Sequence, residues 1–351
     1  MPILADIADA IVGVDTHRDV HSLQIAHSNG VPIAEHSVSN NDAGYAEAID
    51  WAVRHAPGPR LFFALEGSRS YGIGLSRALA AAGLPVVEVV RPARDNRRRG
   101  KGKNDQIDAG LAVLAALRLD SSQLPTPRAD GDREALRILL DAREEMTTTR
   151  TRQVNRLRAL LLTGDDDERQ LARGALTVTR LEAIGRCRTR RSDSVERQVL
   201  LGETRRLARM IRQADIELTA NARLLTDLIN RIAPKLLQRR GIGPVSAAQA
   251  IVSFSHPGRC RHDGAFAALA GTCPIPASSG KTTRWRLNRG GDRALNRAIH
   301  TIAHSRMVHC PRTRAYVCKR QAEGKSIAEI RRCIKRYVTR ELFRALTSAM
   351  T

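Results

Sequence analysis

The sequence has few aromatic residues, no paired cysteines and no long apolar run. Aromatic side chains make up 3% of the 351 residues, which argues against a platform of stacked aromatics for single-stranded nucleic acid. The six cysteines show no C-x-x-C spacing, so we expect free thiols and no zinc site. No segment approaches the ~20 apolar residues of a membrane span, and the N-terminus lacks the features of a signal peptide. We therefore expect a soluble, cytoplasmic protein with no membrane partner.

Acidic residues are scarce relative to basic ones, and the imbalance varies along the chain. The formal net charge is +22, from 58 Lys and Arg against 36 Asp and Glu. Residues 1–90 carry 5 basic against 10 acidic residues, whereas 91–103 carry 7 against 1 and 281–351 carry 18 against 4. A basic excess attracts polyanions, of which nucleic acid is the commonest in cells. The distribution predicts an acidic, metal-binding N-terminal region that is separate from the main phosphate-binding surfaces.

Residues 1–122 alternate strand and helix patterns. Apolar runs bounded by turn residues predict strands at 11–14, 21–26, 31–38, 61–65 and 84–90, and helices at 43–55, 75–82 and 104–119. Ser-Asn-Gly between the second and third strands indicates a hairpin turn. This order predicts an α/β domain in which helices cover a mixed sheet.

Residues 123–235 are polar, rich in Arg and Glu, and helical in pattern. One stretch alternates spacings of four and three, as a coiled-coil seam does, through Leu207, Ile211, Ala214, Leu218, Asn221, Leu225, Leu228 and Ile232. The seam has two interpretations: it pairs two chains, or it packs within its own chain. Segments 163–169 and 188–194 are predicted to be loops between helices.

Residues 236–351 are predicted to form a third, mostly α-helical domain. Gly241 and Gly243 lie in a Gly-Ile-Gly-Pro turn between helical runs at 234–240 and 245–254. Such a turn presents backbone N–H groups to a phosphate in a helix-hairpin-helix element, but a plain connection between helices fits equally well. A Pro/Ser/Gly loop follows, and Asp292 is a suitable N-cap for the final basic helical region.

Four acidic residues of the N-terminal domain are candidate metal ligands. Asp15 and Glu66 close predicted strands, and Asp105 and Asp108 lie three apart in the first turn of a predicted helix. Taken singly, each acid is more simply a strand-end or helix-start cap. Together at one rim of a sheet they repel, and a hard divalent cation stabilises such a set. The set therefore predicts a Mg²⁺ site, also open to Mn²⁺, that acts on phosphodiesters.

Two separated parts of the chain carry a family resemblance. The segments GVDTHRDVHSLQIA (13–26), ALEGSRSYGIGLSRALAAAGLPVVEVVRP (64–92) and KGKNDQIDAGLAV (101–113) resemble the RuvC-like, RNase H-like domain of IS110-family insertion-sequence transposases. The segments 241–254 and 266–303 are similar to the second domain of that family. The resemblance implies a DNA recombinase of transposable elements in which Asp15, Glu66, Asp105 and Asp108 bind the metal.

The resemblance also implies a catalytic serine in a Pro-x-x-Ser-Gly type loop. The matching residue is Ser279, and the adjacent Ser278 is the alternative. Attack of a serine hydroxyl on a DNA phosphate gives a phosphoserine that keeps the bond energy for rejoining. On composition alone, these two serines and Gly280 form an ordinary loop.

Basic runs and the glycine turn provide the candidate contacts to nucleic acid. These are Arg97, Arg98, Arg99, Lys101, Lys103, Gly241, Gly243, Lys281, Arg284, Arg286, Arg289 and Arg293. The resemblance implies DNA partners, the element ends and the target, and a structured guide RNA. Because the acids and the serine are far apart in sequence, we expect a homo-oligomer, a dimer or tetramer, to assemble the active site. The alternatives are a RuvC-like nuclease that uses water, and a non-catalytic nucleic-acid-binding protein.

Overall fold

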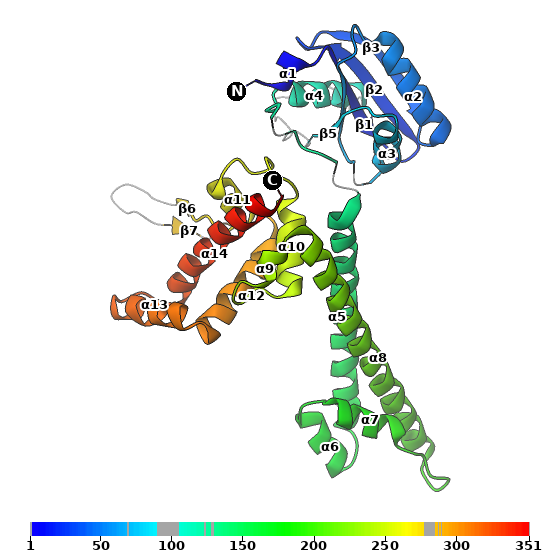
Figure 1. The fold of residues 1–351 in the computed structure, drawn as a ribbon. Helices are drawn as coiled ribbons and strands as arrows, with labels where there is room; N and C mark the ends of the chain where they lie inside the picture. The colour runs from blue at the N-terminus through cyan, green and yellow to red at the C-terminus, as the bar shows by residue number, and fades with distance from the viewer. Residues whose placement is uncertain are drawn as a thin grey trace. The chain divides into compact units, whose positions relative to one another are not determined.

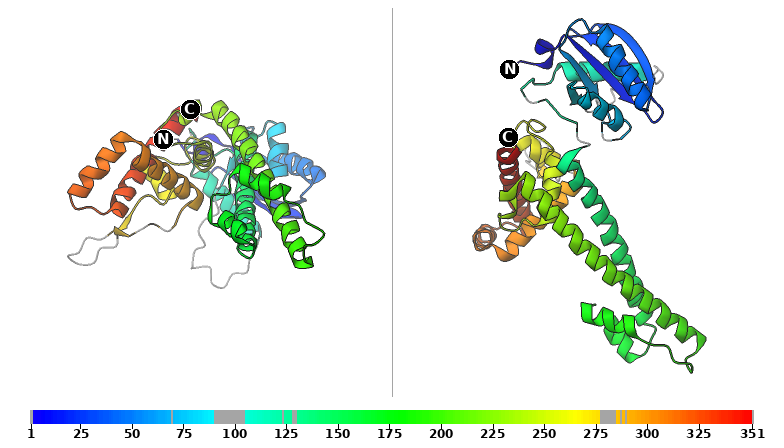
Figure 2. Two further views of the ribbon diagram at one scale, coloured as in Figure 1. Left: turned by 90° about the horizontal axis from the view of Figure 1, so that it is seen from below. Right: turned by 45° about the vertical axis from the view of Figure 1, so that its right-hand side comes forward.

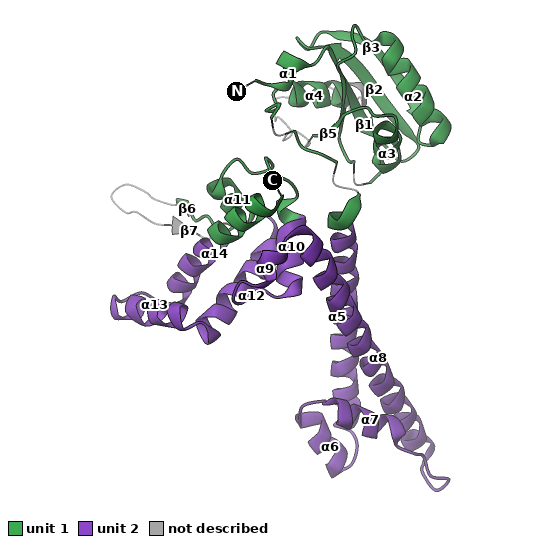
Figure 3. Cartoon of the chain, in the orientation of Figure 1, with its two compact units in different colours: residues 1–134, 253–291, 339–351 green, residues 135–252, 292–338 purple. Residues whose placement is uncertain are grey.

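The computed structural model describes residues 2–68, 70–89, 105–122, 124–127, 130–276, 285–286, 288 and 290–350. The chain forms two compact units (Figure 3). Unit 1 comprises 1–134, 253–291 and 339–351, and unit 2 comprises 135–252 and 292–338. The three sequence domains, 1–122, 123–235 and 236–351, stay a prediction.

The N-terminal part of unit 1 contains a mixed five-stranded sheet in the order β3-β2-β1-β4-β5 (Figure 1). The strands are β1 (Ala10–Thr16), β2 (Val20–His27), β3 (Pro32–Ser39), β4 (Leu61–Leu65) and β5 (Val86–Glu88). β2 is antiparallel to β1 and β3, whereas β4 is parallel to β1 and β5. The predicted mixed sheet is confirmed. β5 is shorter than the predicted run 84–90 and starts after Pro85, which has no N–H for a strand ladder.

Helices cover both faces of this sheet. α2 (Asp42–His55) and α3 (Ile73–Ala81) share one core with alternate residues of β1 such as Val12 and Val14. On the other face, α1 (Leu4–Ile7) and α4 (Asp105–Leu117) share a core with Ile11. Successive residues of a strand point to opposite faces, so Ile11, Gly13 and Asp15 belong to the α4 face.

α4 packs on β1 too closely for a side chain at Gly13. A Cβ there would lie 2.1 Å from the Ala109 carbonyl oxygen and 2.8 Å from Cγ2 of Val113. At the opposite end of the sheet, a Cβ on Gly30, in the turn after β2, would lie 3.2 Å from Leu114 of α4. α4 therefore runs antiparallel to β1, and its first turn lies toward the carboxyl end of β1.

The middle of the chain is a hairpin of two long helices, α5 (Gly131–Leu161) and α8 (Val195–Ile232), which lie side by side in Figures 1 and 2. Asn221, the polar residue of the seam, is 5% exposed. Its amide donates to the Leu139 carbonyl oxygen (2.9 Å), and Arg143 donates to its Oδ1 (3.2 Å). At this position the seam therefore packs on α5 of the same chain. Pairing between two chains stays a prediction.

Two short helices, α6 (Asp166–Arg173) and α7 (Val178–Arg186), connect the long ones. α6 starts inside segment 163–169, so the loop predicted there is wrong from Asp166 onward. The cause is a capping box: Asp165 Oδ1 accepts from the Glu168 N–H (3.0 Å), and the Glu168 carboxylate accepts from the Asp165 N–H (3.1 Å). Segment 188–194 contains no helix or strand, as predicted.

The described residues after α8 are mostly helical, as predicted, and also include a short two-stranded sheet. Their elements are α9 (Pro234–Leu237), α10 (Pro244–Phe254), α11 (Asp263–Leu269), β6 (Ile275–Pro276), β7 (Trp285–Arg286), α12 (Arg293–His309), α13 (Pro311–Ala322) and α14 (Ile327–Met350). The predicted N-cap is confirmed, because Asp292 Oδ1 accepts from the Leu295 N–H (2.9 Å). Gly241, with φ of +79°, adopts the left-handed conformation in the turn before α10.

Substitution Gly13→Ala tests the close approach of α4 to β1. The new methyl group would overlap a backbone oxygen, which cannot rotate away, so we expect a loss of about 3 kcal/mol in the free energy of unfolding. Urea unfolding followed by circular dichroism measures it. Gly202→Ala is the control, since its Cβ meets nothing within 4 Å in α8 and should gain up to about 1 kcal/mol. Equal stability of Gly13→Ala and the wild type would contradict the packing described here.

Candidate active site

Asp15 lies near the carboxyl end of β1 and is 5% exposed. It is opposite Ser22 of β2 in the strand register, and its Oδ2 is 3.1 Å from Nε2 of His17. Because Asp15 alternates with Gly13, its side chain belongs to the face on which α4 packs. A buried carboxylate therefore lies on the side of the sheet where α4 begins.

Glu66 directly follows β4, the parallel neighbour of β1. Its N–H donates to the Val14 carbonyl oxygen (3.2 Å), and Thr16 Oγ1 donates to the Glu66 carbonyl oxygen (2.7 Å). These two bonds join Glu66 to the residues on either side of Asp15, so the Glu66 backbone lies beside that of Asp15. Gly67, with φ of +74°, then turns the chain away from the strand direction. The two acids predicted from separate strands are thus neighbours at one edge of the sheet.

Asp105 and Asp108 lie in the first turn of α4. The direction of α4 brings this turn toward the edge that holds Asp15 and Glu66, and the helix dipole favours negative charge at that end. Asp108 is half-buried, and the side chain of Asp105 lies outside the description. Among the described side chains, no three His, Cys, Asp or Glu residues come close enough together to hold a metal ion. The four acids share an edge through their backbones, and their coordination of a metal stays a prediction.

The donor atoms of these acids fit one class of metal. All four side chains offer carboxylate oxygens, which suit hard cations such as Mg²⁺ and Mn²⁺ better than Zn²⁺ or copper. Asp15 is buried and Glu66 and Asp108 are half-buried, so solvent would only partly screen a repulsion between these carboxylates if they were brought together. A divalent cation would offset that repulsion.

His21 belongs to the same sequence segment as Asp15 but has a different environment. It is fully buried on the opposite face of the sheet, and its ring stacks on Tyr45 of α2 with centroids 6.1 Å apart. Burial lowers the pKa of His21 from its ordinary value of 6.5. Neither His21 nor Gly13 is a predicted site residue, although Leu23 and Ile25, which share a strand face with position 21, signal that this position faces inward.

The candidate serines and most of the basic candidates lie outside the described residues. These are Ser278, Ser279, Arg97, Arg98, Arg99, Lys101, Lys103, Lys281, Arg284 and Arg289. Arg286 of β7 and Arg293, the first residue of α12, are described and exposed. Their contact with nucleic acid stays a prediction.

The glycine turn packs against α12 in unit 2. A Cβ on Gly241 would lie 3.1 Å from Cγ of Arg306, and Arg306 Nε donates to the Arg240 carbonyl oxygen (2.8 Å). A Cβ on Gly243 would meet nothing within 4 Å. Gly241 thus packs closely against α12, and a helix-hairpin-helix element that binds phosphate stays a prediction.

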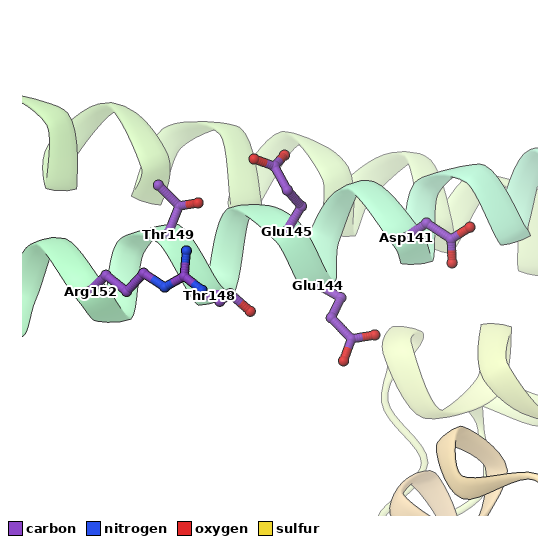
Figure 4. A pocket seen from close by; sticks show the side chains of 6 residues that line it. All are labelled: Asp141, Glu144, Glu145, Thr148, Thr149 and Arg152. Carbon is purple, nitrogen blue, oxygen red and sulfur yellow. The ribbon is translucent and has the colours of Figure 1, made fainter.

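A groove of about 470 Å³ runs along α5, and no predicted site residue is part of its lining (Figure 4). Its lining is Asp141, Glu144, Glu145, Thr148, Thr149 and Arg152. Three carboxylates against one guanidinium repel a phosphate chain. Glu144 also pairs with Arg297 of α12 (3.1 Å). The groove is a poor candidate for a nucleic-acid site.

Two parts of the chain match family models of transposases. Residues 12–164 match a model of the DEDD type found in IS110, described as a transposase, and residues 233–318 match one described as the transposase IS116/IS110/IS902 family. The chain is therefore a transposase, a class of enzyme that binds, cuts and recombines DNA. More particularly, it belongs to the IS116/IS110/IS902 family, which confirms the resemblance seen in the sequence.

A curated relative supports this assignment over most of the chain. The chain is 26% identical over 361 residues to the insertion element IS116 uncharacterized 44.8 kDa protein of Streptomyces clavuligerus, a match that covers 89% of this chain and 88% of the relative. Among the described residues, no helix is long and apolar enough to cross a membrane.

The lowered pKa of His21 predicts that acid destabilises the sheet. An unfolded histidine binds a proton near pH 6.5, whereas buried His21 resists it. The contribution of uncharged His21 to the free energy of unfolding is therefore complete above pH 6.5. It is lost as pH falls through the lower pKa of the folded state. Replacement by Phe keeps a ring beside Tyr45 and should flatten the pH dependence of the free energy of unfolding between pH 7.5 and 5.

Urea unfolding at several pH values measures this slope, which for one proton is at most about 1.4 kcal/mol per pH unit. His27→Gln is the control, because His27 is an exposed residue of the same strand. An unchanged slope in His21→Phe, or an equal change in His27→Gln, would show that His21 is not the acid-sensitive group.

Proposed function

We propose that this transposase cuts and rejoins DNA strands with Ser279 as nucleophile and a Mg²⁺ or Mn²⁺ ion bound by Asp15, Glu66, Asp105 and Asp108. The observation that carries the proposal is the meeting of Asp15, Glu66 and the first turn of α4 at one edge of the sheet. The match of residues 12–164 to a DEDD transposase model supports the same four acids.

Each described acid has a distinct support. His17 contacts the Asp15 carboxylate and limits its rotation, whereas two backbone bonds fix Glu66 beside it. Asp108 is carried on a helix whose position depends on Gly13. A divalent cation held there would stabilise the negative charge that develops on the oxygens of a reacting phosphodiester.

The covalent step is a transesterification. The Ser279 oxygen forms a bond to phosphorus, the bond from phosphorus to one deoxyribose oxygen breaks, and the proton of the serine passes through solvent to the leaving oxygen. Attack on the phosphoserine by a hydroxyl of another DNA end reverses these changes and joins the strands. The number of phosphodiester bonds is conserved, so no external energy source is needed.

The proposal includes a guide RNA and a homo-oligomer. RNA duplexes are bound largely through their shape and their phosphate backbone. The strongly basic segment 281–351 offers positive charge for such a backbone and so supports binding of RNA as well as DNA. The acids and Ser279 lie in different parts of the sequence, which supports an assembly in which one chain's serine serves another chain's acids.

Substitution Asp15→Asn tests the role of the acids. Loss of one metal-binding charge should lower the rate of Mg²⁺-dependent strand cleavage more than about 100-fold, a larger effect than removal of a group that only hydrogen-bonds to a metal ligand. The assay measures cleavage of DNA that carries the element ends. Asp19→Asn is the control, because the Asp19 side chain is 86% exposed and four residues away. Cleavage at the wild-type rate in Asp15→Asn would leave a non-catalytic binding protein as the better account.

Substitution Ser279→Ala tests the nucleophile, with Ser278→Ala as the matched control. We expect a covalent protein–DNA adduct in the wild type and in Ser278→Ala, and its loss in Ser279→Ala. Denaturing electrophoresis of labelled DNA detects the adduct. Strand cleavage at full rate in Ser279→Ala would favour a nuclease that uses water, and loss of the adduct in Ser278→Ala alone would move the nucleophile by one residue.

A further inference from the structure

In unit 2, α12 and the first half of α14 face each other with sides that carry cationic groups. Asn296, His300 and His304 recur every four residues on α12 and so share one face. Arg331 and Lys335 have the same spacing on α14. Lys335 Nζ donates to Asn296 Oδ1 at 2.6 Å, which places the two faces opposite each other. We call His300, His304, Arg331 and Lys335 the α12–α14 basic cluster.

The members of this cluster affect one another electrostatically. The His300 and His304 rings are nearly parallel, with centroids 6.5 Å apart. Burial lowers the pKa of His300, and the charges of Lys335, Arg331 and His304 lower it further. Burial and the charge of Arg331 also lower the pKa of Lys335. The four groups are thus close enough for their positive charges to repel.

Arg331 is the most informative member of the cluster. Its Nε is buried and has no hydrogen-bond partner among the described residues, where Arg331 and His304 also make no ion pair with a carboxylate. Other arginines of unit 2 do have such partners, for example Arg150 with Asp215 (2.5 Å). Holding the Arg331 guanidinium partly buried without a carboxylate partner costs free energy, which an anionic ligand would recover.

We propose that the α12–α14 basic cluster binds a backbone phosphate of nucleic acid. Guanidinium, ammonium and imidazolium groups all donate charge-assisted hydrogen bonds to phosphate oxygens. A metal cation is excluded as the ligand because Arg331 and Lys335 would repel it. The inference rests on the DNA binding of the family and not on the proposed serine chemistry, so the two can fail separately.

His300 makes this contact depend on pH. The charged or titratable groups that face His300 are His304 on its own helix and Arg331 and Lys335 on α14. A phosphate beside them stabilises protonated histidine, so binding of phosphate and of protons is mutually favourable. Affinity for nucleic acid should therefore rise as pH falls from 7.5 to 5.5.

Fluorescence anisotropy with the full chain tests the proposal on a DNA duplex and on an RNA duplex of the same sequence. We expect wild-type affinity to rise roughly tenfold between pH 7.5 and 5.5, and most of that rise to vanish in His300→Gln. His309→Gln is the control, because His309 is an exposed histidine at the far end of α12. The duplex on which the rise vanishes identifies the source of the phosphate.

A second variant tests the cluster without titration. Arg331→Gln should lower the slope of log affinity against log salt concentration by about 0.9, as the loss of one phosphate contact does. Arg332→Gln, the same charge change on an exposed neighbour, should leave that slope unchanged. Circular dichroism verifies that each variant is folded. Equal slopes for Arg331→Gln and the wild type, or a pH response that survives in the histidine variant on both duplexes, would overturn the proposal.

Discussion

At Gly13, the backbone of α4 comes so near to β1 that a single methyl group would lie 2.1 Å from the Ala109 carbonyl oxygen. Interiors are close-packed, so a contact between two backbones fixes the position of a helix more tightly than contacts between flexible side chains do. Asp15 is two residues from this glycine, and Asp108 is one residue from Ala109. The distance between an acid on the sheet and an acid on the helix therefore depends on the absence of a side chain at position 13.

Strand geometry places Asp15 and His21 on opposite faces of the same sheet. Asp15 lies on the α4 face, whereas His21 lies on the opposite face in the core under α2. β1 thus places a carboxylate on the α4 face, and β2, the next strand along the chain, places an imidazole in the core of the opposite face. In unit 2, by contrast, the α12–α14 basic cluster brings cationic side chains together where two helices of the same chain meet.

Much of the N-terminal fold could be predicted from the sequence, because strand signals there are strong. The strand at 61–65 was predicted at its observed bounds, since an apolar run is delimited by Pro59 on one side and Glu66 and Gly67 on the other. The helix at 166–173 was missed, because its capping box lies in a run of acids that reads as a loop. Heptad spacing indicated that Asn221 would be buried, but a seam does not specify its partner, and only the structure shows Arg143 and α5 beside it.

The candidate site was less predictable than the fold. Strand-end placement suggested that Asp15 and Glu66 meet, and the register of β1 and β4 places them together. The direction of α4 depends on a glycine whose role no sequence pattern displays. The prediction of Ser279 as the nucleophile depends on the family resemblance. The close electrostatic contact of His300 with Arg331 and Lys335 joins residues about thirty positions apart, which no local spacing rule connects.

The most direct test of the account is the location of a divalent cation in the whole protein. Anomalous X-ray diffraction from crystals soaked in Mn²⁺ would locate it, because Mn²⁺ accepts the same oxygen ligands as Mg²⁺ and scatters anomalously. The account predicts a Mn²⁺ ion at the edge where β1 and α4 meet, bound by Asp15 together with a carboxylate from the first turn of α4. A Mn²⁺ ion bound elsewhere at saturating concentration, with that edge empty, would contradict it.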